Sequence, residues 1–190
     1  MSRYLSLLAF GAVLASGCAN STQMVATWRD QSVAPIHPTR TLAVFMSKDP
    51  GMRRMVEDKM ALRLPGGVQS YTVIPDAELG TMDSVHSRLK KGGFDAAVVM
   101  RLVNVETQVT ETAAPHDFYG YWNYWSYAYD PVYYTTEKLY SVESTLYSFR
   151  DGKMIWMGRS QTVDPKNANK LADYSVNFAV KNMRKQGVMY

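Results

Sequence analysis

The 190-residue sequence contains a single cysteine, Cys18, and only three histidines, His37, His86 and His116. A single cysteine excludes any disulfide within the chain, so the fold must be held by its hydrophobic core. The histidines lie far apart, and none forms a metal-ligand pair at close spacing. The sequence also lacks a Gly-x-Ser-x-Gly elbow and a phosphate-binding Gly-Lys-Ser/Thr loop. We therefore predict no catalytic residue, no metal and no cofactor, and we expect that the protein is not an enzyme.

Long apolar runs are also missing, apart from one near the N-terminus. That run, YLSLLAFGAVL, extends from Tyr4 to Leu14 and follows Arg3. It is too short to cross a hydrocarbon layer of ~30 Å, which needs roughly 20 helical residues. A short basic start followed by an apolar run of this length is typical of a secretory signal peptide. We predict that residues 1–17 are that signal peptide and that the rest of the chain has no membrane span.

The signal sequence ends in Ala15-Ser16-Gly17-Cys18, which resembles the bacterial lipobox, although Ala15 stands where leucine is usual. The resemblance implies cleavage after Gly17 and diacylglycerol on the Cys18 thiol, with palmitate-type acyl chains. Two or three such chains anchor a protein stably, whereas one chain does not. Ala19 follows, where an aspartate would signal retention in the inner membrane. We therefore expect a lipid-anchored envelope protein at the outer membrane, facing the periplasm.

Charge excludes one further class of partner. The net charge is +4, and loss of Arg3 with the signal peptide leaves about +3. The basic residues are dispersed and form no stripe, so we expect no nucleic-acid partner. The mature length suits one domain. We expect residues 18–38 to form the lipidated N-terminus and a tether, with Trp28 docking on a single domain at 39–190.

The first half of that domain alternates strands and helices. A strand is expected from Thr41 to Met46, and Asp49-Pro50 predicts the start of a helix that ends near Leu64. On this helix Arg53 and Glu57 form an i,i+4 pair on the polar side, away from a methionine-rich stripe. Further elements are expected as a strand over 68–74, a helix over 82–91, and a strand from Asp95 whose alternation continues to Val109.

An aromatic insert, residues 115–136, separates these elements from a terminal hairpin. Strands are expected over 139–150 and 153–163, joined by the turn signal Asp151-Gly152. Asp164-Pro165 then predicts a second helix start, and the last helix is expected over 166–184. The fold class is thus α/β (mixed α+β), with the order βαβαβββα. We expect a mixed five-stranded sheet of order 2-1-3-4-5, with helices on both faces.

This plan resembles the αβ domains of the curli-secretion lipoprotein, the penicillin-binding-protein activator lipoproteins and the N-terminal domain of the Tol translocation protein. It resembles more closely a widespread group of uncharacterised bacterial envelope lipoproteins. The matching residues are Arg54 to Asp58, Ser70 to Pro75, Leu146-Tyr147 and Gly152 to Trp156. They are structural, so Cys18 is the only functional residue that the resemblance carries over. The relatives imply an assembly or partner-binding role.

The aromatic insert is the most unusual feature of the sequence. Ten of the seventeen residues from Phe118 to Tyr134 are aromatic. One interpretation is a hairpin tip that folds back and buries its own rings. The others are a docking site for a protein partner or a second copy, a glycan-stacking surface, or a loop at the membrane–water interface. The candidate binding residues are Tyr119, Tyr121, Trp122, Tyr124, Trp125, Tyr127 and Tyr129.

The leading functional hypothesis is a non-catalytic, membrane-anchored lipoprotein that binds or assembles envelope components. A protein partner or self-association ranks first, and a peptidoglycan-binding module is the alternative. An enzyme with an unrecognised site is a third hypothesis, which requires a deep cleft with converging polar groups.

Overall fold

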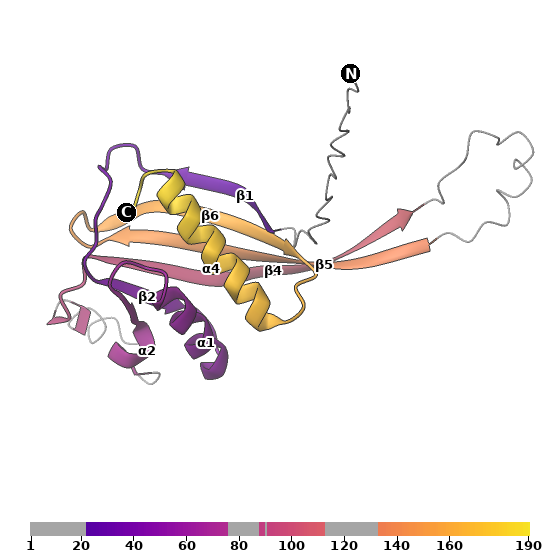
Figure 1. The fold of residues 1–190 in the computed structure, drawn as a ribbon, viewed down its shortest axis with the longest axis horizontal. Coiled ribbons are helices and arrows are strands. Elements are labelled where there is room, and N and C mark those ends of the chain that lie inside the picture. The colour runs from indigo at the N-terminus through magenta and orange to yellow at the C-terminus, as the bar shows by residue number, and fades with distance from the viewer. Residues whose placement is uncertain (1–21, 76–87, 90, 113–132) are drawn as a thin grey trace, which may run out of the picture.

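The computed structural model describes residues 22–75, 88–89, 91–112 and 133–190. Six strands and three labelled helices occupy these ranges, as Figure 1 shows. In chain order they are β1 (Thr22–Arg29), β2 (Thr41–Phe45), α1 (Pro50–Ala61), β3 (Gly67–Gln69), α2 (Ser70–Val73), β4 (Ala96–Thr112), β5 (Tyr133–Ser148), β6 (Lys153–Val163) and α4 (Ala168–Lys185).

The strands form one mixed sheet in the order β1-β6-β5-β4-β2-β3. Strand β2 is parallel to both of its neighbours, and the other pairs are antiparallel. The predicted fold class is confirmed, and the five predicted strands keep their predicted relative order. The predicted number of strands is wrong, because β1 adds a sixth strand beside β6.

Strand β1 lies inside the segment that we expected to be a tether. Its residues pair antiparallel with β6 from Thr22↔Thr162 to Arg29↔Trp156. The sequence of this segment resembles a linker because few of its side chains are buried. Met24 packs against the core, whereas Trp28 is 44% exposed. An edge strand of this kind is held mainly by backbone hydrogen bonds, which leave no periodic apolar signal in the sequence.

Two shorter elements also differ from the prediction. The strand expected over 68–74 covers only Gly67–Gln69, and the chain then turns into α2. Residues 88, 89 and 91 are helical, and the rest of the helix expected over 82–91 lies outside the described residues. Helix α1 begins as predicted, with Pro50 in its first turn and the Asp49 carboxylate accepting from the N–H groups of Gly51 and Met52.

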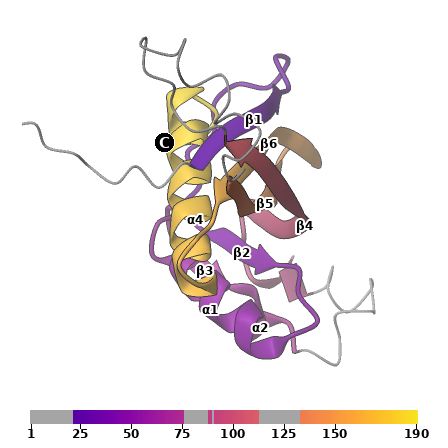
Figure 2. The ribbon, with the colours of Figure 1, turned by 90° about the vertical axis from the view of Figure 1, so that its right-hand side faces the viewer.

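The sheet is covered unequally on its two faces. On one face, α1 and α4 pack over the larger core cluster, which includes Trp156, Leu146 and Met183. Figure 2 shows α4 running along one side of the strands, with α1 and α2 close to β2. On the opposite face a smaller cluster holds Leu42, Ile74, Phe94 and Ala97, with Val73 of α2 and the helical Leu89 packed against it. Helical residues therefore lie on both faces, as predicted.

Candidate functional site

The residues predicted from the sequence to form functional sites lie outside the described residues. These are Gly17, Cys18 and the seven candidate binding residues between 119 and 129. Of the aromatic insert, only residues 133–136 are described, and they belong to β5. The structure therefore places the two strands that flank the insert, β4 up to Thr112 and β5 from Tyr133, and these strands define where it is attached.

A two-stranded arm carries the aromatic insert. We use this name for residues 107–112 of β4 and 133–138 of β5, which pair from Thr107↔Lys138 to Thr112↔Tyr133. Strand β2 stops pairing with β4 at Met100, and β6 stops pairing with β5 at Leu139. Beyond these points the two strands pair only with each other, and Figure 1 shows them leaving the body of the domain. Six residue pairs correspond to roughly 20 Å of projection.

A β-bulge at Val103 sets which side chains the arm presents on each face. The register of β4 against β5 shifts between Leu102 and Asn104. Because side chains alternate along a strand, the extra residue keeps Leu102, Val105 and Val109 on the face that α1 and α4 cover further back. Val105 is 45% exposed and Val109 is 62% exposed. The polar residues Asn104, Glu106 and Gln108 occupy the other face. Within the arm itself, Val109 shares its face with Thr107, Thr136 and Lys138.

Asp164, which directly follows β6, is hydrogen-bonded to the base of the arm. Its carboxylate accepts from the Lys138 N–H at 2.8 Å, and its own N–H donates to the Lys138 carbonyl at 2.9 Å. Asp164 has a φ of 38°, a conformation that Asp and Asn tolerate better than most residues. The prediction that Asp164-Pro165 begins a helix is wrong. Helix α4 begins at Ala168, and the Asn167 side chain caps it by accepting from the N–H of Lys170.

An ion-pair ladder crosses the polar face of the sheet just behind the arm. Glu143 of β5 accepts from Arg101 of β4 at 2.7 Å and from Arg159 of β6 at 3.1 Å. Burial raises the pKa of Glu143, but the hydrogen bonds from both arginines outweigh it and hold the pKa below its usual value. The two ion pairs connect three strands, β4, β5 and β6. Because the pKa of Glu143 is lowered, its side chain is a carboxylate near neutral pH and cannot donate a proton there.

A buried ion pair joins α1 to α2 and β2. Arg53 is 2% exposed and Glu57 is 0% exposed, so the expectation that this pair lies on the polar side of the helix is wrong. The Glu57 carboxylate accepts from Arg53 Nε at 3.1 Å, from Ser70 Oγ at 2.7 Å, and from the N–H groups of Phe45 and Tyr71. Four donors engage both carboxylate oxygens, which fits a structural clamp better than a reacting group.

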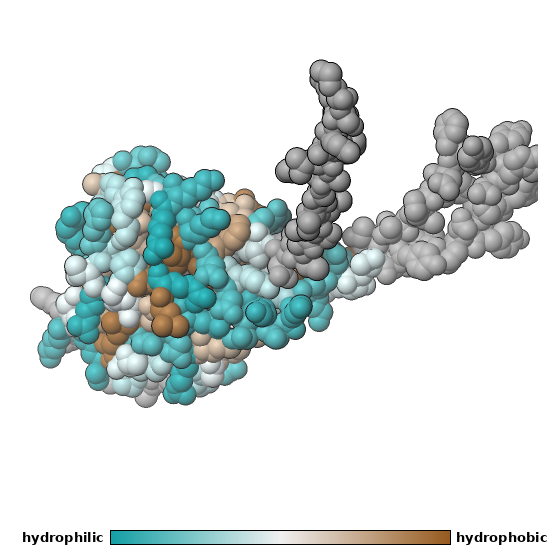
Figure 3. Space-filling model, viewed as in Figure 1, coloured by the Kyte–Doolittle hydropathy of each residue, from teal (hydrophilic) through white to brown (hydrophobic). Residues whose placement is uncertain are grey.

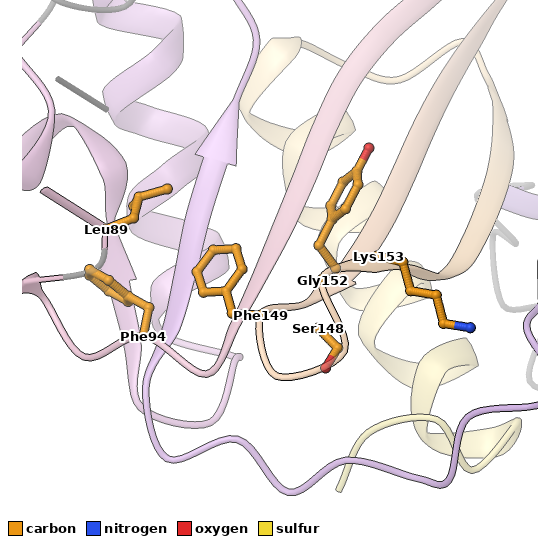
Figure 4. A pocket seen from close by; sticks show the side chains of 7 residues that line it. Leu89, Phe94, Ser148, Phe149, Gly152 and Lys153 are labelled. Atoms are coloured by element: carbon orange, nitrogen blue, oxygen red, sulfur yellow. The ribbon is translucent and has the colours of Figure 1, made fainter. Parts of the chain in front are cut away.

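A surface hollow of about 470 Å³ lies at the end of the sheet opposite the arm. Leu89, Phe94 and Phe149 gather on one side of it, and the Lys153 side chain points away from them (Figure 4). Lys153 Nζ lies 2.7 Å from the carboxylate of Asp30, so this charge is engaged outside the hollow. The lining is mainly apolar and gives no support to the enzyme hypothesis, which needs converging polar groups.

The described residues contain neither a metal-binding cluster nor a membrane-spanning helix. No group of three or more His, Cys, Asp or Glu side chains that could hold a metal ion occurs among them. None of their helices is both long enough and apolar enough to cross a bilayer. On the face seen in Figure 3 hydrophilic side chains prevail, and hydrophobic ones show only in small patches.

No family model matches the sequence, and no curated protein matches it. The chain is similar to the solved PelC dodecamer from Paraburkholderia phytofirmans, at 7% identity and a TM-score of 0.46 over 90% of this chain and 99% of that one. A point variant of the same PelC has a TM-score of 0.45 at 10% identity, over 82% of this chain and 94% of that one. Lipoprotein GNA1162 from Neisseria meningitidis has a TM-score of 0.39 at 15% identity, over 78% of this chain and 99% of that one. These likenesses are too distant to assign the chain to a family or to a function.

Proposed function

We propose that the protein is a lipoprotein of the bacterial cell envelope, anchored through Cys18, whose domain has a non-catalytic binding or assembly role. The arm is the observation that carries this proposal. Strands β4 and β5 stay paired up to Thr112↔Tyr133, beyond the support of every other described strand. An isolated two-stranded ribbon is marginally stable in water. A ribbon that carries an aromatic sequence at its end is therefore expected to gain stability from a ligand.

The composition of the insert restricts the class of ligand. Tyrosine and tryptophan, interspersed with Ser, Asn and Gly, supply rigid contact area and adaptable hydrogen bonds, as in protein-binding surfaces. The same flat rings can stack on sugars. From the sequence, an envelope protein or a second copy of this chain ranks above a glycan such as peptidoglycan, and the membrane interface ranks third.

Crosslinking tests whether the aromatic insert binds a partner. Replacing Tyr121, Trp122, Tyr124 and Trp125 together by alanine should abolish crosslinks in intact envelopes, while circular dichroism and the Tm stay unchanged. The matched control replaces the exposed aromatics Tyr147 and Phe149 at the opposite end of the sheet, and it should leave the crosslinks intact. Crosslinks that survive the first change, or that are lost equally in the control, would count against the proposal.

A glycan ligand is tested with purified sacculi. If the insert stacks on sugars, the mature chain should sediment with sacculi and the four-alanine variant should not. Failure of the parent chain to sediment removes peptidoglycan from the possible ligands.

The anchor is tested by the change Cys18→Ser. This variant should lose the acyl mass and should be either unprocessed or released from membranes, because no other thiol in the chain can accept the lipid. A Ser16→Ala variant serves as the control and should still be acylated. Normal processing and normal membrane attachment of Cys18→Ser would contradict the assignment.

A further inference from the structure

The N-terminal strand starts at the same end of the sheet as the arm. One row of paired residues crosses the sheet from Thr22 of β1 through Thr162 and Tyr140 to Val105 of β4. From this row β1 runs away from the arm, and Figure 1 shows its arrow pointing in that direction. The chain that precedes Thr22 therefore enters the domain at the arm end. The last described pair of the arm lies seven residue pairs beyond the row, or roughly 23 Å.

The chain between the anchor and β1 is very short. Only residues 19–21 separate Cys18 from Thr22, and even a fully extended segment of this length reaches roughly 14 Å. Strand β1 itself spans roughly 26 Å. If the arm pointed away from the membrane, the connecting segment would have to pass the whole length of β1 to reach the lipid. Its covalent length does not allow this.

We propose that the arm end of the domain lies against the bilayer that holds Cys18, and that the lipid surface is the ligand of the arm. This inference rests on the proposed function, since it requires the acylated Cys18. With strands upright the arm is longer than the connecting segment, so its end meets the lipid. With strands inclined, the arm lies along the lipid surface. Both arrangements bring residues 107–112 and 133–138 to the membrane.

The chemistry of the arm fits an interfacial location. Val105, just behind the arm, and Val109 within it lie on one face and are both exposed to solvent. The sequence that joins the two strands is rich in tyrosine and tryptophan, the residues that favour the membrane–water interface. From residue 106 to residue 138 the sequence carries five acidic residues and one basic residue, namely Glu106, Glu111, Asp117, Asp130, Glu137 and Lys138. This balance favours zwitterionic over anionic lipid.

Site-specific fluorescence quenching tests the orientation. The acylated chain is purified from membranes and placed in phosphatidylethanolamine–phosphatidylcholine vesicles without other proteins. A single added cysteine takes an environment-sensitive label, because the sulfur of acylated Cys18 does not react. The change Thr136→Cys labels an exposed position of the arm, and Arg150→Cys labels the hairpin at the far end, roughly 45 Å away along β5. Quenching by headgroup-labelled lipid should be severalfold stronger at position 136 than at 150, and weaker at 136 when anionic lipid is added.

The outcomes separate this inference from the proposed function. A chain without acyl mass, or one that does not float with vesicles, overturns both. An acylated, floating chain with equal quenching at the two positions overturns the membrane contact alone. The same is true if the arm label is unquenched in vesicles but crosslinks to another protein in native envelopes, because the ligand is then a protein. Energy transfer between arm labels without lipid quenching would identify a second copy of the chain and would also overturn it. Unchanged Tm values show that neither label disturbs the fold.

Discussion

Removing the Glu57 carboxylate should destabilise the domain more than removing any exposed carboxylate. The change Glu57→Ala removes the carboxylate that accepts from Arg53 Nε at 3.1 Å, and Arg53 is only 2% exposed. Removing one partner of a buried ion pair costs about 3–5 kcal/mol. The N–H groups of Phe45 and Tyr71 also lose their acceptor, which adds about 1 kcal/mol or more for each one that water cannot reach. We expect the free energy of unfolding to fall by at least about 3 kcal/mol.

Urea denaturation of the mature chain carrying Cys18→Ser measures this loss, and two further variants test its cause. Glu106→Ala removes an exposed carboxylate near the arm and should change the free energy of unfolding by less than about 0.5 kcal/mol. The double change Arg53→Met with Glu57→Leu removes both charges, so it should cost less than Glu57→Ala alone. A loss below about 1 kcal/mol for Glu57→Ala, or a double variant less stable than the single one, would refute the clamp.

Three further predictions use the same mature chain. The change Asp164→Ala removes the acceptor for the Lys138 N–H and puts alanine at a φ of 38°, so urea unfolding should show a loss of about 1–3 kcal/mol, whereas Asp164→Asn should be nearly neutral. Hydrogen bonds from Lys153 and Ser32 lower the pKa of Asp30 to about 2. Its contribution to stability is therefore present above about pH 4 and lost as the pH falls towards 2, and NMR titration of a Lys153→Met variant should show the pKa of Asp30 moving up towards 3.8. Deleting residues 19–29 should lower the free energy of unfolding by at least about 2 kcal/mol, because β6 loses its hydrogen bonds to β1, whereas deleting only 19–21 should not.

The elements that sequence reasoning located well are those whose signal is local. Strand β6 has the predicted bounds, Lys153–Val163, because its side chains alternate and Asp151-Gly152 marks the turn before it. The strand predicted over 139–150 is β5, which ends earlier, at Ser148, so the turn comprises residues 149–152. Gly152 has a φ of 67°, the conformation for which glycine is favoured at such a turn. The Asp49-Pro50 start of α1 is local in the same way, since cap and helix lie within three residues of each other.

The errors share a different cause, which is a partner distant in the sequence. Arg53 and Glu57 carry the spacing of an exposed ion pair, and only the approach of α2 turns them into a buried clamp. Asp164 stands before a proline, as a helix cap does, but its carboxylate accepts a hydrogen bond from the N–H of Lys138 instead. In both cases the sequence pattern predicts a local interaction and the structure shows a distant one, because a side chain that can pair locally can also pair across the fold.

The misassigned strand β1 has the largest consequence for function. A flexible tether over residues 18–38 would reach roughly 70 Å when extended and would let the domain take any orientation above the membrane. With residues 22–29 in β1 beside β6, only residues 19–21 separate Cys18 from the sheet, and β1 begins at the end of the sheet that carries the arm. Under the proposed lipid anchor at Cys18, this short connection favours the lipid surface over a protein or glycan as the ligand of the arm. Pairing of seven residues of β1 at a sheet edge thus changes which ligand of the aromatic insert is favoured, although the sequence of the insert itself is unchanged.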